Sequence, residues 1–193
     1  MPNYYPVMLD VRGRRAVVVG GDRVAAEKAR SLCASGADVT VIGPTFCRAL
    51  RELGESGAVT LRRKEYEPAD LAGAFVVVAA SNDAELIESI WAETQQHGQI
   101  VNVVDVPARC NFIVPSILRR GQLTIAVSTE GASPSLAKRI RQRLEDLFPP
   151  AYDAYLRLAT TARAHLRSGG VSYEQRDLFL SLIHISEPTR QAE

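Results

Sequence analysis

The stretch RRAVVVGGDRVAAEKA, Arg14 to Ala29, decides the fold. It joins a fully apolar run, Ala16 to Val19, to a pair of glycines and then to a segment in which apolar residues recur at helical spacing. An apolar run of β-branched residues is typical of a strand that is covered on both faces. The order of strand, glycine turn and helix predicts the first unit of an α/β fold that can hold a nucleotide.

The glycine turn departs from the usual dinucleotide-binding pattern at one position. In that pattern the first glycine makes the turn, the second lets the pyrophosphate approach, and the third position takes a small residue. Gly20 fits the first role, with Gly21 beside it, and Ala25 fits the third. The second role falls on Asp22, whose charge would face phosphate. A tight turn that binds nothing therefore remains the alternative, although the start of the following helix still favours an anion.

The first hundred residues continue the alternation of strand-like and helix-like segments. We expect strands at 38–43, 59–63, 74–80 and 99–105, and helices at 24–34, 45–55 and 84–97. Because parallel neighbours need crossover connections, short links between these segments predict a doubly wound parallel sheet of the Rossmann-like α/β class.

The segment after the second expected strand leaves the choice between NAD and NADP open. A dinucleotide site often has an acidic residue there, which holds the ribose, or an arginine for a 2′-phosphate. This chain has neither, because Ile42 and Gly43 are followed by Pro44 and Thr45. Thr45 either hydrogen-bonds a ribose hydroxyl or caps the next helix.

The segment NVVDVP, Asn102 to Pro107, places the carboxylate of Asp105 at the carboxyl end of a buried strand. Ligands of open α/β sheets bind at that edge. A carboxylate beside a nicotinamide is placed to act as a general base or to orient a substrate proton. The alternative is that Asp105 caps the following turn.

The pattern changes after Asp105. Two short apolar segments flank Arg120 and Gly121, and an amphipathic helix follows with Leu136, Ile140, Leu144 and Leu147 on one face. Pro149 and Pro150 break that helix, and helical patterns return at 152–166 and from Tyr173. The final HISEPTRQAE, from residue 184, is polar and without periodicity, so it carries no functional signal.

Composition excludes several classes of function. A net charge of +1 over 193 residues gives no case for nucleic-acid binding. No apolar stretch approaches the ~20 residues of a membrane span, and no signal peptide is visible. The three cysteines, Cys33, Cys47 and Cys110, form no metal or disulfide pattern, and no histidine cluster suggests a metal ligand set. We therefore expect a cytoplasmic protein with no membrane contact and no bound metal.

Four motifs in order resemble the precorrin-2 dehydrogenase and sirohydrochlorin ferrochelatase family, the N-terminal module of siroheme synthase. They are YPVMLDVRGRR (5–15), VVVGGDRVAAEKA (17–29), NVVDVPARCNF (102–112) and VPSILRRGQLTIAVSTEGASPSLAKRIRQRLE (114–145). The resemblance implies three parts, namely a Rossmann NAD-binding domain at 1–113, a small α+β dimerisation region at 114–149 and a helical domain at 150–193.

The resemblance also implies an activity and a set of residues. The implied reaction is the NAD-dependent oxidation of precorrin-2 to sirohydrochlorin, with insertion of Fe²⁺ to give siroheme in many members, by a homodimer. The essential aspartate of the family falls on Asp105. The positions that contact the cofactor fall on Arg23 and Val24, beside the glycine turn, and on Pro44 and Thr45. The serine-rich loop of the family falls on 128–134.

Precorrin-2 carries eight carboxylates, so a site that binds it needs cations and free N–H donors. The helix that begins at Ser133 and Pro134 offers unpaired amides. Arginine and lysine residues near this helix add a local positive charge, which the small net charge of the whole chain does not reveal. The expected substrate-binding set is Ser128, Ser133, Arg109, Arg120 and Lys138.

Two rival functions remain open from the sequence. One is a chelatase that has lost the use of NAD because of Asp22. The other is a nucleotide-sensing Rossmann module that is not an enzyme and regulates a partner. The NVVDVP strand and the basic helix start argue against the sensor, which needs neither.

Overall fold

The computed structural model describes residues 4–170, 172 and 175. The chain divides into two compact units between Ile113 and Val114, and each is described by itself.

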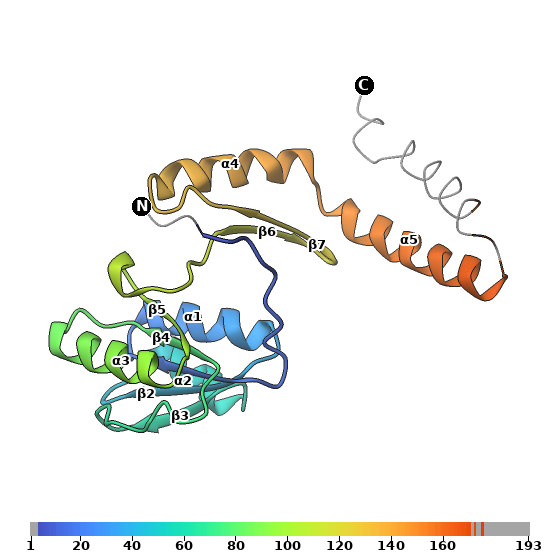
Figure 1. Ribbon diagram of the computed structural model, residues 1–193. Coiled ribbons are helices and arrows are strands. Elements are labelled where there is room, and N and C mark those ends of the chain that lie inside the picture. Colours follow the sequence, from blue (N-terminus) through green and yellow to red (C-terminus); the bar gives the residue numbers. More distant parts are fainter. Residues whose placement is uncertain (1–3, 171, 173–174, 176–193) are drawn as a thin grey trace. The chain divides into compact units, whose positions relative to one another are not determined.

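The first unit is built on a five-stranded parallel sheet in the order β3-β2-β1-β4-β5 (Figure 1). Its strands are β1 (Arg15–Val19), β2 (Asp38–Gly43), β3 (Thr60–Arg63), β4 (Val76–Ala79) and β5 (Ile100–Val103). From β1 the chain runs outward to β2 and β3, and then crosses to β4 and β5 on the other side. The predicted doubly wound, Rossmann-like sheet is thereby confirmed.

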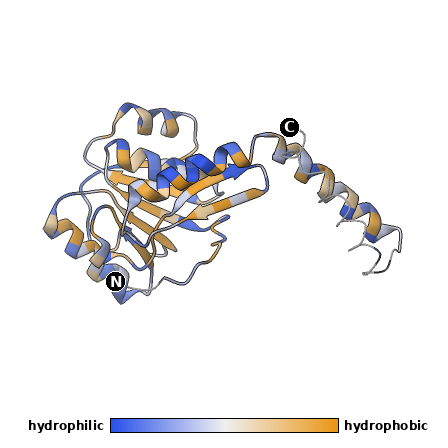
Figure 2. Cartoon of the chain, turned by 90° about the horizontal axis from the view of Figure 1, so that it is seen from above, coloured by the Kyte–Doolittle hydropathy of each residue, from blue (hydrophilic) through white to orange (hydrophobic). Residues whose placement is uncertain are grey.

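Three helices cover the two faces of this sheet. They are α1 (Arg23–Ala34), α2 (Arg48–Glu55) and α3 (Ala84–Gln96). Because successive strand residues point to opposite faces, Val18 packs with the α1 and α2 residues Ala29 and Leu50, whereas Val17 packs with Ile87 and Ile90 of α3. Figure 2 shows the strands as the hydrophobic layer of this unit, which explains their uninterrupted apolar runs.

The helix ends follow from local sequence, with one exception. The side chain of Asp83 accepts from the amides of Glu85 (2.9 Å) and Leu86 (3.2 Å), so Asp83 is the N-cap of α3. The expected start of α2 at Thr45 is wrong. The cap is Cys47, because its amide donates to Gly21 O (2.7 Å), which ties this loop to the glycine turn before the helix begins.

The second unit consists of an antiparallel hairpin and helices. The hairpin is β6 (Ser116–Arg120) and β7 (Leu123–Val127), and its turn at Gly121 has a φ of 57°. Helix α4 (Pro134–Leu147) packs against both strands, and α5 (Ala151–Ser168) follows the proline break. The helix expected from Tyr173 and the tail from 184 lie outside the described residues.

Candidate functional site

A cavity of about 560 Å³ lies at the carboxyl ends of the central strands. Its floor is formed by Val19 at the end of β1, Ile42 at the end of β2 and Ala80 directly after β4. Between β1 and β4 the chain reverses its direction of winding across the sheet, and such switch points are where α/β sheets hold ligands. The cavity therefore has the position of a dinucleotide site.

The two glycines of the turn are needed to let neighbouring loops approach. Gly20 has a φ of 143°, and a Cβ at this position would collide with the carbonyl oxygen of Ala80. A Cβ on Gly21 would collide with the carbonyl oxygen of Thr45. Gly20, Gly21 and Thr45 all line the cavity, so these glycines bring three strand ends together at one place.

Asp22 lines the cavity but its carboxylate is engaged with the helix behind it. Its Oδ1 accepts a hydrogen bond from the amide of Ala25 (2.9 Å), which makes Asp22 the N-cap of α1. The expected clash with phosphate assumed a side chain that faces the ligand. The carboxylate instead meets an amide and the positive end of the helix dipole, which stabilise its charge there.

The first turn of α1 still has donors for an anion. Only the Ala25 amide is taken by the cap, and the Ala26 amide bonds to the Asp22 carbonyl. The amides of Arg23 and Val24 stand at the helix start, where no preceding helical carbonyl exists to accept from them. Two helix N-terminal amides without a partner among the described residues are the donor set that a pyrophosphate requires.

Pro44 and Thr45 line the cavity at the end of β2, where a ribose would lie. Neither is a charged group. Arg63 pairs with Gly43 in the sheet, and its Nε donates to the Pro44 carbonyl (3.1 Å). This contact fixes the Pro44 turn. Thr45 is not a helix cap, so the alternative role suggested by its sequence is excluded.

The cavity also contains residues that the sequence did not indicate. Tyr66, from the loop after β3, and Leu86, from the first turn of α3, form apolar wall of the cavity. Both pack on the core beneath α3. Nothing in their local pattern marks them, because Leu86 has an ordinary core spacing and Tyr66 lies in a loop.

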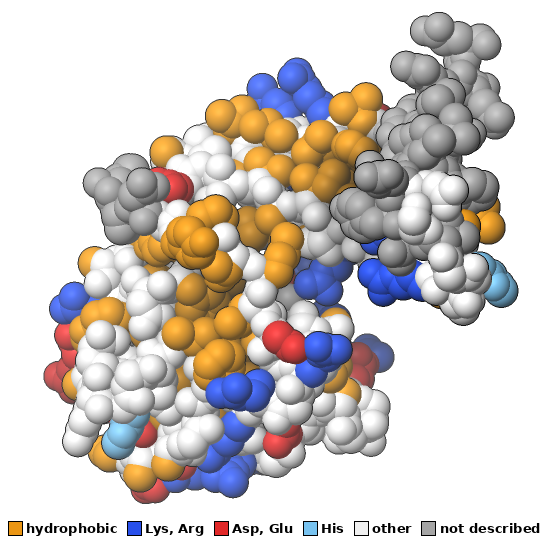
Figure 3. All heavy atoms as spheres, turned by 45° about the vertical axis from the view of Figure 1, so that its right-hand side comes forward, with side chains coloured by type: hydrophobic (Ala, Val, Ile, Leu, Met, Phe, Trp, Pro, Cys, Tyr) orange, Lys and Arg blue, Asp and Glu red, His pale blue; other side chains and the backbone are white. Residues whose placement is uncertain are grey.

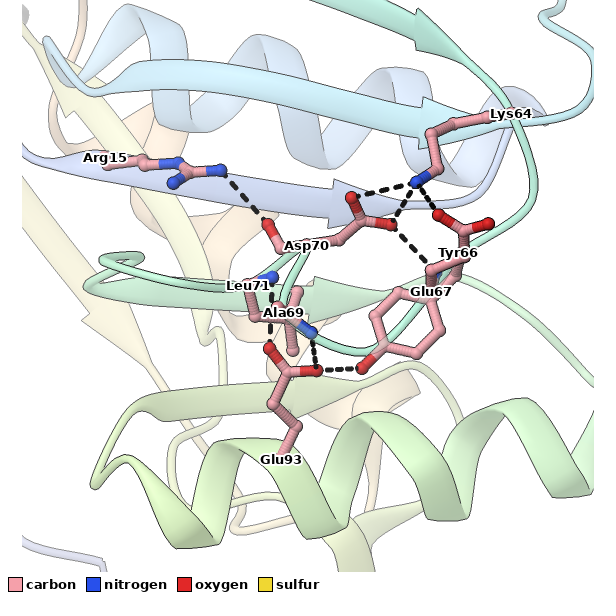
Figure 4. A network of polar contacts seen from close by, with 8 residues as sticks. All are labelled: Arg15, Lys64, Tyr66, Glu67, Ala69, Asp70, Leu71 and Glu93. Atoms are coloured by element: carbon pink, nitrogen blue, oxygen red, sulfur yellow. Dashed lines mark hydrogen bonds and ion pairs between the residues drawn. The ribbon is translucent and has the colours of Figure 1, made fainter.

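A buried carboxylate fixes the position of Tyr66. Glu93, with 9% of its surface exposed, accepts from the Tyr66 hydroxyl (2.5 Å) and from the amides of Ala69 (3.1 Å) and Leu71 (3.2 Å) (Figure 4). Burial and this bond raise the pKa of Tyr66, so its hydroxyl stays a donor. Glu93 thus holds the loop after β3 against α3.

Ion pairs on the other side of the same loop complete the network. Lys64 contacts Glu67 (2.6 Å) and Asp70 (3.1 Å), and these partners raise the pKa of the lysine. Arg15 donates to the Asp70 carbonyl (3.1 Å) (Figure 4). It also donates to the carbonyl of Ala72. The loop is therefore joined both to β1 and to α3, and the wall formed by Tyr66 is fixed from both ends.

Asp105 lies two residues beyond the end of β5, on the same edge of the sheet as the cavity and outside its lining. Its side chain is exposed and its φ is 60°, a conformation that few non-glycine residues adopt. The short 3₁₀ helix at Pro107–Arg109 has Val106 as its N-cap and no side-chain capping bond. The capping alternative for Asp105 is therefore wrong, and its carboxylate is presented to solvent.

Arg109 is already paired in the structure. Its guanidinium contacts both carboxylate oxygens of Glu88 (2.8 and 3.1 Å) and lies 5.7 Å from the ring centroid of Trp91. Glu88 raises the pKa of Arg109 through this bond. The contact fastens the segment after Asp105 to α3, so it gives Arg109 a structural partner in addition to its expected role.

In the second unit the hydroxyls of the expected substrate loop organise the loop itself. Ser128 Oγ accepts from the Glu130 amide (3.0 Å), and Ser133 Oγ accepts from the Leu136 amide (3.3 Å) as the N-cap of α4. Arg120 donates to the carbonyl of Phe148 (2.9 Å). Lys138, on the exposed side of α4, is the member of this set whose charge faces solvent.

Comparisons with known proteins agree with this geometry. A family profile described as putative NAD(P)-binding matches residues 7–116, and one described as sirohaem biosynthesis protein central matches residues 120–147. A siroheme synthase of Nitrosococcus oceani is 36% identical over 176 residues, which are 91% of this chain and 38% of that protein. One of Methylococcus capsulatus is 38% identical over 165 residues, 86% of this chain and 35% of that protein. The chain thus spans little more than a third of these relatives.

A solved structure, SirC, precorrin-2 dehydrogenase, superposes with a TM-score of 0.84 and 31% identity over 98% of this chain and 93% of that chain. The strand order, the cavity and the free amides of α1 define a dinucleotide-binding protein of the Rossmann class. More particularly, the chain belongs to the precorrin-2 dehydrogenase family of siroheme biosynthesis. The resemblance seen in the sequence motifs is confirmed.

Proposed function

We propose that this protein catalyses the NAD-dependent oxidation of precorrin-2 to sirohydrochlorin. The observation that carries the proposal is the cavity at the switch point of the sheet, with free amides of α1 on one side and Asp105 on the same edge. Membership of the precorrin-2 dehydrogenase family supplies the substrate class.

The residues of the cavity fit a dinucleotide. The first-turn amides of Arg23 and Val24 bind the pyrophosphate, and the backbone at Pro44 and Thr45 lies beside the ribose. Tyr66 and Leu86 supply apolar wall for the adenine. Bound in this cavity, NAD⁺ supplies the hydride acceptor of the reaction.

Asp105 is proposed as the proton acceptor. Dehydrogenation removes a hydride from one atom and a proton from a neighbouring one, so a carboxylate beside the nicotinamide position completes the chemistry. In the part of the chain that the structure describes, Asp105 has no ion-pair partner, and its exposed carboxylate is available to a substrate.

The carboxylates of the substrate are proposed to bind Lys138, the Ser128–Ser133 loop and Arg120. Lys138 offers an exposed ammonium group, and the first turn of α4 offers amides next to its Ser133 cap. Arg109 belongs to the proposed set with a lesser role, because Glu88 must release it before it can bind another carboxylate.

The protein is further proposed to act as a homodimer in the cytoplasm. A two-stranded hairpin with one helix buries little on its own, and Leu118 is its single large buried aliphatic side chain among the described residues. Leu136, Ile140 and Leu147 are 47%, 37% and 56% exposed along one stripe of α4. Figure 3 shows hydrophobic side chains grouped on the surface of this unit.

A second candidate function is insertion of Fe²⁺ into sirohydrochlorin. It is favoured by the exposed, unpaired carboxylate of Asp105, which can accept a pyrrole proton as the metal enters. No cluster of metal-binding side chains is present in the described residues, so the iron would arrive as a substrate and not as a resident ion.

The test is a single assay with two stages. The protein is incubated with precorrin-2, with and without NAD⁺, and sirohydrochlorin is followed by its absorbance; in the second stage, Fe²⁺ is added to the protein together with supplied sirohydrochlorin. NAD-dependent formation of sirohydrochlorin, lost in a folded Asp105→Asn variant, is expected. Metal insertion without NAD-dependent oxidation would leave only the chelatase, and the absence of both activities would refute the proposal.

A further inference from the structure

The backbone around Asp105 forms a closed loop, residues 103–110, that returns along the edge of the sheet. Beyond the loop, Asn111 pairs with β5 as a strand would. Its amide donates to the Val101 carbonyl (3.0 Å), and its side-chain oxygen accepts from the Val101 amide (2.7 Å). The side-chain amide of Asn102 also donates to the carbonyl of Phe112 (3.1 Å). These bonds fix the base of the loop.

The thiol of Cys110 holds the middle of the loop. Its sulfur accepts from the Val103 amide (3.2 Å) and lies within hydrogen-bonding distance of the carbonyls of Val103 (3.2 Å) and Val106 (3.4 Å). A thiol has one proton, so it donates to one of these two carbonyls at a time. Val103 and Val106 stand on either side of Asp105, so a single side chain clamps the backbone before and after the carboxylate.

The conformation of Asp105 requires such a clamp. Its φ of 60° costs of order 1 kcal/mol or more for a residue with a Cβ, and such conformations persist where surrounding contacts impose them. The bond from the Val106 amide to the Val103 carbonyl (3.3 Å) is long, so it does not by itself fix this turn. Cys110 and Val106 also pack on the apolar core beneath α3, which prevents the sulfur from moving aside.

We propose that Cys110 is a positioning residue for catalysis, whose thiol holds the Asp105 backbone in its left-handed conformation and thereby aims the carboxylate at the substrate. The inference rests on the proposed role of Asp105. Burial raises the pKa of the thiol, in agreement with a protonated donor and not a reactive thiolate. Cys110 needs no contact with substrate or cofactor for this role.

The test compares Cys110→Ala with Cys110→Ser and with a matched control. In Cys110→Ala we expect kcat for precorrin-2 oxidation to fall about 10- to 100-fold, because a small misplacement of a catalytic group has that effect. The dissociation constant of NAD⁺ should stay within about twofold, because the cavity is formed by other loops. Cys110→Ser keeps a donor and an acceptor and should retain most of the activity.

Cys33→Ala is the control. Its partly buried thiol, in the last turn of α1, donates to the Ala58 carbonyl (3.3 Å), so this variant also loses one partly buried thiol bond. It should keep a wild-type kcat. Wild-type kcat in a folded Cys110→Ala variant would overturn the inference.

Hydrogen exchange gives a readout that does not depend on activity. The amides of Val103 and Val106 should exchange at least about tenfold faster in Cys110→Ala than in wild type, and should be unchanged in Cys33→Ala. Unchanged exchange would overturn the clamp even if wild-type protein had no dehydrogenase activity, whereas absence of that activity alone would refute only the proposed function. If Cys110→Ala does not fold, the test rests on Cys110→Ser. A Cys110→Ser variant that loses kcat while the amides of Val103 and Val106 still exchange slowly would contradict the inference.

Discussion

The carboxylate of Asp22 accepts a hydrogen bond of 2.9 Å from the amide of Ala25, and this bond begins helix α1 at the wall of the cavity. The residue that looked least compatible with a bound phosphate is thus a helix cap. Its charge faces the positive end of the helix, while two neighbouring amides stay free for an anion.

The substitution Asp22→Asn keeps the helix cap and removes the negative charge. Asparagine caps a helix about as well as aspartate, so the free energy of unfolding should change by less than about 0.5 kcal/mol. Removal of the negative charge should tighten NAD⁺ binding a few-fold at low salt, and the gain should shrink as salt is added. Calorimetric titration at two ionic strengths checks this. Weaker binding by Asp22→Asn would show that the carboxylate itself assists the cofactor.

Asp22→Ala is the matched variant, because it loses both features. It should lower the free energy of unfolding by about 1 kcal/mol, the usual cost of a lost N-cap. Urea denaturation measures this cost. Equal stability of Asp22→Ala and wild type would contradict the capping role.

Glu93→Gln should disturb the cavity wall through the loop after β3. The carboxylate accepts from Tyr66, Ala69 and Leu71, whereas a glutamine must turn its NH₂ group toward one of these donors. Leaving a buried donor unsatisfied should cost about 1–3 kcal/mol of unfolding free energy. NAD⁺ should also bind more weakly, because Tyr66 loses its anchor. Urea denaturation and NAD⁺ titration measure the two effects.

Glu67→Gln is the control for that prediction. It removes a partner of Lys64 in the same loop, but the carboxylate of Glu67 is largely exposed. An exposed pair contributes about 0–1 kcal/mol, so stability and NAD⁺ affinity should change little. Comparable losses in both variants would mean that the loop responds to any change of charge and not to the buried network.

The apolar stripe of α4 should form part of a contact between two copies of the chain. Ile140→Glu together with Leu136→Glu should convert the proposed dimer to monomer, because charges would enter an apolar contact. Gln142→Glu, on another side of the same exposed helix, should leave the dimer intact. Sedimentation velocity distinguishes the states. A double variant that remains dimeric would place the interface elsewhere.

Cys110 gives a pH dependence with a defined sign. Burial raises the pKa of its thiol in the folded chain above the unfolded value of about 8.5. Folding therefore favours the protonated thiol. Its contribution to stability is complete below about pH 8.5 and is lost as the pH rises through the higher, folded pKa. The difference in unfolding free energy between wild type and Cys110→Ala should be constant at neutral pH and fall in alkaline solution.

A difference that stayed constant from pH 7 to 10 would contradict a protonated, buried thiol. Denaturation curves of both proteins at closely spaced pH values provide the measurement. Cys33→Ala, compared over the same range, corrects for the titration of other groups.

Much of the fold could be predicted from local sequence. The β-branched runs 16–19 and 74–80 identify buried strands, and Asp83 and Gly98 mark the ends of α3 where the structure has them. The turn at Gly20 and the position of Asp105 at the end of a strand could be predicted in the same way. Each of these signals depends on residues close together in the chain, which is why they can be read without a structure.

The sequence by itself thus determined the strand and helix order, the family and the edge of the sheet where the site lies. Only the tertiary structure decided what the side chains at that edge do. It turned Asp22 toward its own helix, moved the cap of α2 from Thr45 to Cys47, and joined Tyr66 to Glu93 across 27 residues. It also placed the Cys110 thiol in contact with Val103 and Val106, on either side of Asp105. These contacts depend on which loops meet once the strands are aligned, and spacing along the chain does not encode that.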